Sequence, residues 1–244
     1  MEPTPETPVE AFVRRAERIA SGAEHRVPSW LRPEQPENRL PVLFAILAAV
    51  ALQRAVPERY TLLPRWPLVA MELLLVIALV AINPLRLSKR TTLARWGSLT
   101  LTAAITFANT ASAVVLDYRI LTGDVSNDAA VLLGSGGAIY ITNVLAFALW
   151  YWELDRGGPF ARHTGDNPYP DFLFPQMTDP DKAKPGWRPT FVDYLYVSFT
   201  NVVAFSPTDT MPLSRWAKLL MSVQALVAMS TLALVIARAV NVLK

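Results

Sequence analysis

The chain has 244 residues, of which 52% are hydrophobic and 18% charged, with a formal net charge of +3 and no cysteine. A soluble domain carries about 25% charged residues, so this composition favours a membrane protein. The lack of cysteine excludes disulfides, thiolate metal sites and cysteine nucleophiles. Two histidines, His25 and His163, give no basis for a histidine metal site or a catalytic triad. We therefore expect no enzyme activity, no metal and no cofactor.

Residues 1–39 form a polar, proline-rich tail. Within it Val9, Phe12, Val13 and Ala16 recur at helical spacing. This spacing predicts a short amphipathic helix that docks either on the rest of the protein or on lipid headgroups.

Five apolar segments follow, and each is a predicted membrane helix: 40–53, 66–82, 96–116, 129–152 and 216–243. A membrane helix needs about 17–25 residues, so the first segment is short. The fourth ends on Trp150-Tyr151-Trp152, which is typical of an interfacial aromatic belt. We predict an all-α, polytopic membrane protein with a peripheral three-helix bundle over residues 40–128 and a second module over residues 129–244.

A further apolar segment, Phe191–Val203, is of helical length but too short to cross a bilayer of about 30 Å. A polar loop and then the last full span follow it. This order predicts a re-entrant helix that returns to its own side, which requires shielding by protein or a water-filled cavity. The alternative is an interfacial helix that lies flat on the membrane.

The re-entrant segment resembles the pore helix and filter of the potassium-channel superfamily. The residues that fall in register without a gap are Asp193, Leu195, Tyr196, Ser198, Phe199, Asp209 and Pro212. The resemblance implies an outer helix at 129–152, an inner helix at 216–243 and a homotetramer around a four-fold axis. The fragments 150–158 and 205–212 also resemble an uncharacterised family of bacterial membrane proteins, which implies a multi-pass protein of the bacterial inner membrane.

The filter itself departs from that family. Where potassium channels have TVGYG, this chain has Ala204-Phe205-Ser206-Pro207-Thr208. Both glycines are replaced and a proline removes an N–H, so the usual ladder of backbone carbonyls is not expected to form.

Two functions follow from this degenerate filter. One is passive ion permeation without normal potassium selectivity, in which Asp209 forms a ring of carboxylates that attracts monovalent cations. Alternatively Asp209 only caps the loop, and Phe205 and Pro207 plug a channel fold that does not conduct and serves as a scaffold or lipid-binding assembly.

Polar residues of the last span are candidates for the pore lining, namely Gln224 and Thr231. Polar side chains in membrane helices usually face the bundle interior, so an interhelical hydrogen bond is the alternative for Gln224.

Three further polar residues lie within apolar segments. Glu72 is either a functional carboxylate or the partner of an interfacial ion pair near Arg65. Asn109 and Asn143 are expected to make helix–helix hydrogen bonds.

The basic residues flank the apolar segments, as in membrane loops, so lipids and not nucleic acid are the expected partners. Residues 86–95 are basic whereas residues 117–128 are acidic. The positive-inside rule then places the re-entrant loop on the cytoplasmic side, inverted relative to potassium channels. On that side, Tyr169, Phe172, Phe174 and Trp187 are expected to anchor an ordered cap over residues 167–185.

Overall fold

The computed structural model describes residues 28–32, 37–62, 64–82, 92–165, 167–179, 181, 183–203 and 209–242. Over these residues the chain is helical, apart from a two-stranded ladder, short 3-10 turns and connecting segments. The amphipathic helix predicted near residues 9–16 lies outside the described residues.

In the described part of the chain, six longer helices make up the bundle: α2 (Leu40–Ala55), α3 (Arg65–Ile82), α4 (Thr92–Thr122), α5 (Ala129–Leu154), α8 (Phe191–Val203) and α9 (Arg215–Val242). Shorter elements lie between them: η1 (Ser29–Leu31), η2 (Glu58–Tyr60), η3 (Asp155–Gly157), α6 (Pro159–Thr164), α7 (Pro175–Thr178), β1 (Phe172–Leu173) and β2 (Met211–Pro212).

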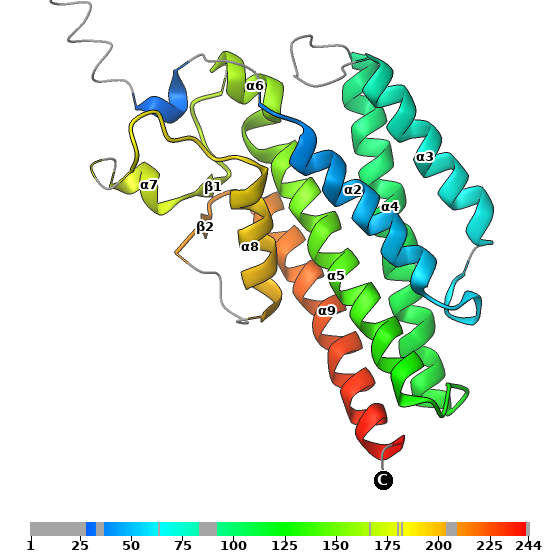
Figure 1. Ribbon diagram of the computed structural model, residues 1–244. Helices are drawn as coiled ribbons and strands as arrows, with labels where there is room; N and C mark the ends of the chain where they lie inside the picture. Colours follow the sequence, from blue (N-terminus) through cyan, green and yellow to red (C-terminus); the bar gives the residue numbers. More distant parts are fainter. Residues whose placement is uncertain are drawn as a thin grey trace, which may run out of the picture.

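Helix α5 is the centre of the bundle and packs against α2, α4, α8 and α9, while α3 lies on the outer side of α4 (Figure 1). The short elements η1, α6, α7, β1 and β2 gather at the end of the bundle where α5 stops and α9 begins (Figure 1). We call this end the cap. The predicted peripheral bundle and C-terminal module share one hydrophobic core, since Leu101 of α4, Phe147 of α5 and Tyr194 of α8 belong to the same buried cluster.

Local chemistry explains where α5 begins and ends. The carboxylate of Asp128 accepts hydrogen bonds from the N–H groups of Ala130 and Val131 at 2.8 and 3.3 Å, a helix N-cap. At the other end Gly157 and Gly158 adopt positive φ angles of 82° and 98°. A glycine adopts these angles at little cost, so the chain leaves the helix here and turns into α6.

Among the described residues, three helices are long and apolar enough to cross a membrane: Thr92–Thr122, Ala129–Gly157 and Arg215–Val242. The predicted first and second spans form α2 and α3, which have 16 and 18 residues. The all-α architecture therefore fits the sequence prediction of a membrane protein, whereas only three of the five predicted spans meet the length and composition of a full crossing.

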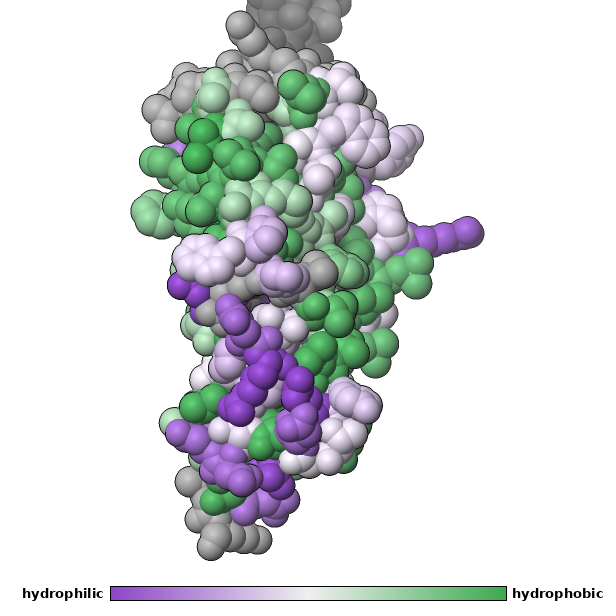
Figure 2. Space-filling view, turned by 90° about the vertical axis from the view of Figure 1, so that its right-hand side faces the viewer, coloured by the Kyte–Doolittle hydropathy of each residue, from purple (hydrophilic) through white to green (hydrophobic). Residues whose placement is uncertain are grey.

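The polarity of the bundle is that of a protein in lipid. Large apolar side chains are exposed on its outer surface, for example Leu74 at 67% and Ile77 at 65% on α3, whereas Glu72 of the same helix is fully buried. Figure 2 shows hydrophobic residues gathered over the face that carries α3, with hydrophilic residues collected toward one end. Soluble monomers rarely expose apolar patches of this extent, and membrane bundles turn their polar residues inward.

Candidate functional site

The half-length helix α8 enters the bundle from the cap and the chain returns to the cap. Helix α8 has 13 residues, about 20 Å, and it packs along α5 and α9. Further along the chain β2 pairs antiparallel with β1, with Pro212 opposite Phe172 and Met211 opposite Leu173. The indole N–H of Trp216, at the start of α9, then donates to Asp171 of the cap at 2.9 Å. Both ends of the segment 191–214 therefore lie at the same end of the bundle (Figure 1).

The side chain of Asp193 stabilises the start of α8 by reaching back to Thr190. The carboxylate of Asp193 accepts hydrogen bonds from the backbone N–H and the hydroxyl of Thr190 at 2.7 and 2.9 Å. Asp193 is the third residue of the helix. From there its carboxylate satisfies donors at the N-terminus that have no partner within the helix. This contact gives Asp193, one of the residues in register with potassium channels, a structural role.

Gln224 of α9 joins three helices inside the chain. Its amide oxygen accepts hydrogen bonds from the Tyr151 hydroxyl of α5 at 2.6 Å and from the Asn201 amide of α8 at 2.9 Å. Its amide nitrogen donates to the hydroxyl and the carbonyl oxygen of Ser198 at 2.7 and 3.1 Å. We call Gln224 and these three partners the glutamine clasp. It ties the half-length helix to both of its full-length neighbours.

The enclosure of the α9 polar residues argues against the pore-lining role predicted for them. Gln224 and Thr231 are 0% and 1% exposed within the single chain, so neither presents its polar group to a surface that a second subunit could share. The Thr231 hydroxyl faces Asp117 of α4 at 3.4 Å, and Ser230 donates to the same carboxylate at 2.9 Å. For Gln224 the alternative interpretation, an interhelical hydrogen bond, describes its contacts.

The predicted filter residues Ala204, Phe205, Ser206, Pro207 and Thr208 lie outside the described residues. Asp209, which follows them, is exposed, and Thr210 beside it is 4% exposed.

The predicted intramembrane polar residues have different surroundings. The Asn109 amide of α4 donates to the Ile139 carbonyl of α5 at 3.1 Å, which is the helix–helix hydrogen bond expected of it. Asn143 is 1% exposed and its amide has no hydrogen-bond partner among the described residues, so the same expectation is not met there. Glu72 is 0% exposed, and within the described part of the chain its carboxylate accepts no hydrogen bond.

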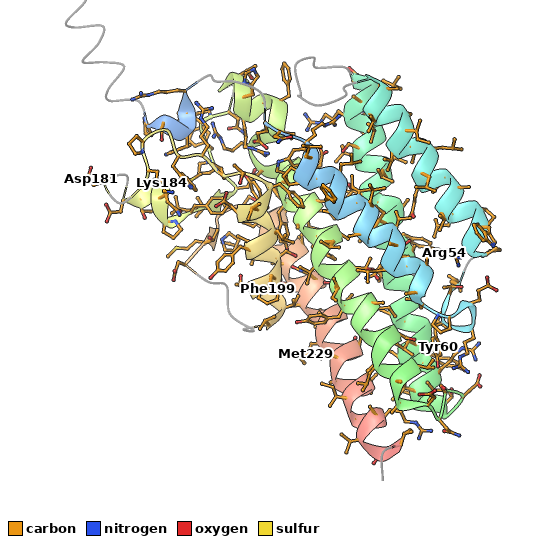
Figure 3. All side chains as sticks on the ribbon, in the orientation of Figure 1. Arg54, Tyr60, Asp181, Lys184, Phe199 and Met229 are labelled. Atoms are coloured by element: carbon orange, nitrogen blue, oxygen red, sulfur yellow. The ribbon has the colours of Figure 1, made fainter. Side chains whose placement is uncertain are left out.

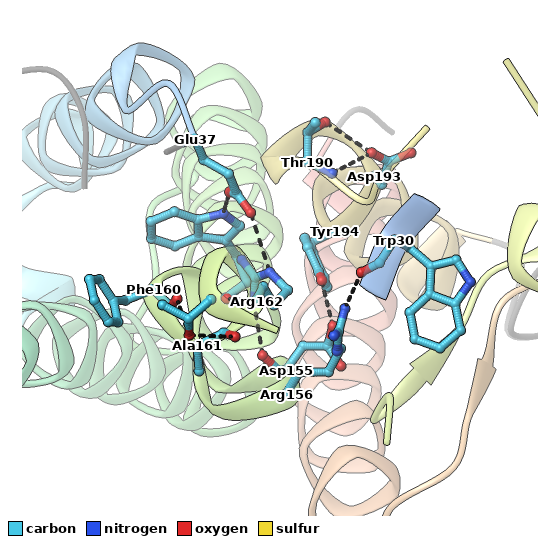
Figure 4. Close-up of polar contacts among 12 residues, drawn as sticks. Trp30, Glu37, Asp155, Arg156, Phe160, Ala161, Arg162, Thr190, Asp193 and Tyr194 are labelled. Atoms are coloured by element: carbon cyan, nitrogen blue, oxygen red, sulfur yellow. Dashed lines mark hydrogen bonds and ion pairs between the residues drawn. The ribbon is translucent and has the colours of Figure 1, made fainter. Parts of the chain in front are cut away.

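The cap holds a buried polar network centred on Asp155 (Figure 4). One oxygen of this fully buried carboxylate accepts hydrogen bonds from the N–H groups of Asp171 and Phe172 at 2.8 and 3.3 Å, and the other accepts from the Tyr194 hydroxyl at 2.5 Å. Asp155 thus holds the cap loop and α8 to the end of α5. Burial is compensated here because all of these donors satisfy the carboxylate.

Two arginines lie in this network, Arg156 at 1% and Arg162 at 4% exposure. The Arg162 Nε donates to the Glu37 carboxylate at 3.3 Å, and its Nη1 donates to the carbonyl oxygens of Trp152 and Asp155 at 2.7 and 2.9 Å. Burial alone would lower the pKa of the Arg162 guanidinium, but the nearby negative charges, including Glu37 and Asp155, outweigh burial and raise that pKa above its ordinary value. Arg162 therefore stays charged.

The sequence predicts a salt-bridged terminus of the fourth helix at Asp155 and Arg156, but it does not predict that Arg162 and Glu37 join this network. Arg162 and Glu37 are 125 positions apart in the chain, so no local spacing could pair them. The adjacent Gly157 and Gly158 were the available signal, because they mark a sharp turn that folds α6 back over the end of α5. The predicted anchors Phe172 and Phe174 are buried at 0% and 3%, which confirms an ordered cap.

Tyr169 was also predicted as an anchor of the cap, and this prediction is wrong because its side chain is 80% exposed. Within the described residues, no group of three or more histidine, aspartate or glutamate side chains could hold a metal ion. Comparison of the chain with family models, curated proteins and solved structures finds no match. The class is therefore defined by the architecture alone, that of a helical bundle suited to a membrane in which the 13-residue helix α8 packs along α5 and α9.

Proposed function

We propose that the protein is a membrane pore protein in which several copies surround the returning segment after α8 and permit passive passage of monovalent cations without normal potassium selectivity. The order of a full helix, a half-length helix and a second full helix in α5, α8 and α9 supports this proposal. The observation that carries it is the return of segment 191–214 to the cap, with β2 paired to β1. A segment that enters a membrane and returns is tolerated where protein or a watery path shields its irregular backbone.

Helix polarity is consistent with a cation path. The first residue of α8 lies at the cap and its last, Val203, lies within the length of the bundle (Figure 1). The last turn of a helix carries partial negative charge from its open carbonyl groups, which favours cations near it. In this proposal the exposed carboxylate of Asp209 adds a full negative charge to the same segment.

The outer surfaces of α8 and α9 suit contacts between subunits. Phe199 and Tyr196 of α8 are 49% and 57% exposed, and Leu226 and Met229 of α9 are 67% and 53% exposed. Figure 3 shows Phe199 and Met229 on neighbouring helices of the same part of the bundle. In a homotetramer, side chains of this size and shape would pack against the next subunit around the axis.

Flux through liposomes tests the proposal. Purified protein is reconstituted, and potassium and sodium fluxes are compared between the natural chain, Asp209→Asn and Asp124→Asn. Asp124 is the matched control because it is an exposed carboxylate on a different connection, that between α4 and α5. We expect cation flux that falls in Asp209→Asn and is unchanged in Asp124→Asn. No flux at any voltage or pH would exclude the pore function.

One observation favours the second candidate, a scaffold of channel-like shape that does not conduct. The glutamine clasp and the Asp117–Thr231 contact hold polar side chains of α9 inside the chain, while Leu219, Val223 and Leu226 occupy its outer face. Such an apolar face can contact lipid or neighbouring helices. It can equally form a dry constriction that ions do not pass. Oligomers that assemble but show no flux would support this candidate.

A further inference from the structure

The cap contains a cavity of about 240 Å³ whose walls are strongly cationic. Arg156, Arg162, Arg188 and His163 line it, and Glu37 is the one carboxylate among the lining residues that the structure describes. A cavity of this size is several times larger than one water molecule requires.

Among the residues that the structure describes, the side chain of Arg156 donates only to neutral acceptors. Its Nε donates to the carbonyl of Asn167 at 2.8 Å and its Nη1 to the carbonyl of Trp30 at 2.7 Å, while its guanidinium lies 5.1 Å from the centre of the Trp30 ring. The neighbouring carboxylate, Asp155, gives its oxygens to Tyr194 and to backbone N–H groups instead. A guanidinium that is 1% exposed and has no carboxylate partner among the described residues is costly to bury.

Buried side-chain nitrogen atoms around the cavity also lack partners in the described part of the chain. The Nη2 groups of Arg156 and Arg162 and the Nδ1 of His163 are buried and have no partner among the described residues. Arg162 pairs with one carboxylate, that of Glu37. The second oxygen of Glu37 accepts a hydrogen bond from the indole N–H of Trp152 at 2.6 Å. Both oxygens of Glu37 are therefore already engaged, by Arg162 and Trp152 and not by Arg156.

We propose that this cavity is a binding site for a phosphate group. Guanidinium and imidazole donors that converge from different elements suit a tetrahedral oxyanion, which offers several acceptor oxygens and negative charge. Either an anionic lipid headgroup or a soluble phosphate compound could bring this group to the cap. Basic pockets between membrane helices are a recognised mode of headgroup binding. The proposal is independent of whether the protein conducts ions.

Titration of inorganic phosphate into the purified full-length chain in detergent, at constant ionic strength with chloride as the balancing anion, tests the site. Phosphate should raise the unfolding temperature in a saturable way that chloride does not reproduce. Because Arg156 and Arg162 also hold the cap together, the test variants are Arg188→Gln and His163→Gln, which change residues on the cavity wall that are only partly buried.

Arg188→Gln should weaken phosphate binding about tenfold or more, the effect of losing a charged hydrogen-bond donor. His163→Gln should also weaken it. Arg59→Gln is the matched control, since it removes the same charge from an exposed arginine of η2, which lies outside the cap, and should leave the affinity within about twofold of the natural value.

Reconstitution in phosphatidylcholine with and without phosphatidylglycerol identifies the source of the phosphate group. Stabilisation by phosphatidylglycerol that competes with phosphate and is lost in Arg188→Gln supports a lipid headgroup. Phosphate binding without any effect of phosphatidylglycerol supports a soluble phosphate compound. Equal effects of phosphate and chloride, or equal sensitivity of Arg188→Gln and Arg59→Gln, would overturn the proposal.

Discussion

Replacement of Gln224 by leucine is the most direct test of how the half-length helix is held. The change keeps the approximate size of the side chain but replaces the amide by an apolar group. It therefore removes four hydrogen bonds, two accepted from Tyr151 and Asn201 and two donated to Ser198. The Tyr151 hydroxyl, fully buried, then has no acceptor within the glutamine clasp.

The expected loss of stability follows from these contacts. A hydrogen bond between membrane helices contributes about 0.6 kcal/mol on average, and one in a soluble interior about 1 kcal/mol. Four such bonds therefore contribute about 2.4–4 kcal/mol. The orphaned Tyr151 hydroxyl adds about 1 kcal/mol or more, partly offset by the apolar leucine. We expect Gln224→Leu to destabilise the folded chain by about 2–4 kcal/mol, a factor of about 30 to 1,000 in the unfolding equilibrium.

Titration with sodium dodecyl sulfate in mixed micelles, followed by tryptophan fluorescence, measures this change. Ser222→Ala is the control, because Ser222 lies on the same helix but is exposed and bonds only to the Lys218 carbonyl among the described residues. It should change stability by less than about 0.5 kcal/mol. A double-mutant cycle of Gln224→Leu with Tyr151→Phe should show coupling. If Gln224→Leu is as stable as Ser222→Ala, the glutamine clasp does not hold α8.

Three further outcomes can be checked in the same system. Gly136→Ala should destabilise the protein by about 1–3 kcal/mol, because a methyl group there would lie 2.8 Å from Val235 of α9. Gly137→Ala is the control, since no atom lies within 4 Å of the added methyl group, and it should be neutral or stabilising in the same titration. Asp155→Asn should destabilise the protein by about 2–4 kcal/mol and increase amide hydrogen exchange in the cap. The reason is that the hydrogen bonds from two N–H groups and one hydroxyl are no longer charge-assisted. Unchanged exchange would contradict the anchoring role of Asp155. Tyr169→Cys, at a position 80% exposed, should react with an impermeant thiol reagent only after cells are permeabilised; labelling of intact cells would exclude a cytoplasmic cap.

Local patterns predicted the half-length helix well. Its predicted limits, Phe191 and Val203, are those of α8, because an apolar run between Pro189 and the Ser206-Pro207 step has few other places to begin and end. The sequence leaves two roles open for Gln224, pore lining or an interhelical hydrogen bond. The helical period places a residue on a face of the helix but does not say what that face contacts. Only the positions of Tyr151, Ser198 and Asn201 decide that it meets the chain's own helices.

The sequence is enough to predict that this protein suits lipid and which segments form its longer helices. Composition and the length of apolar runs report directly on transfer from water to lipid, so the all-α architecture and the short α8 could be predicted from them. Which polar groups contact one another depends on the tertiary structure. Glu37, Asp155 and Arg162 come together because the chain turns at Gly157 and Gly158 and brings Arg162 of α6 to the Asp155 carbonyl and to Glu37. Such contacts depend on the paths of segments far apart in the chain, and no local period carries that information.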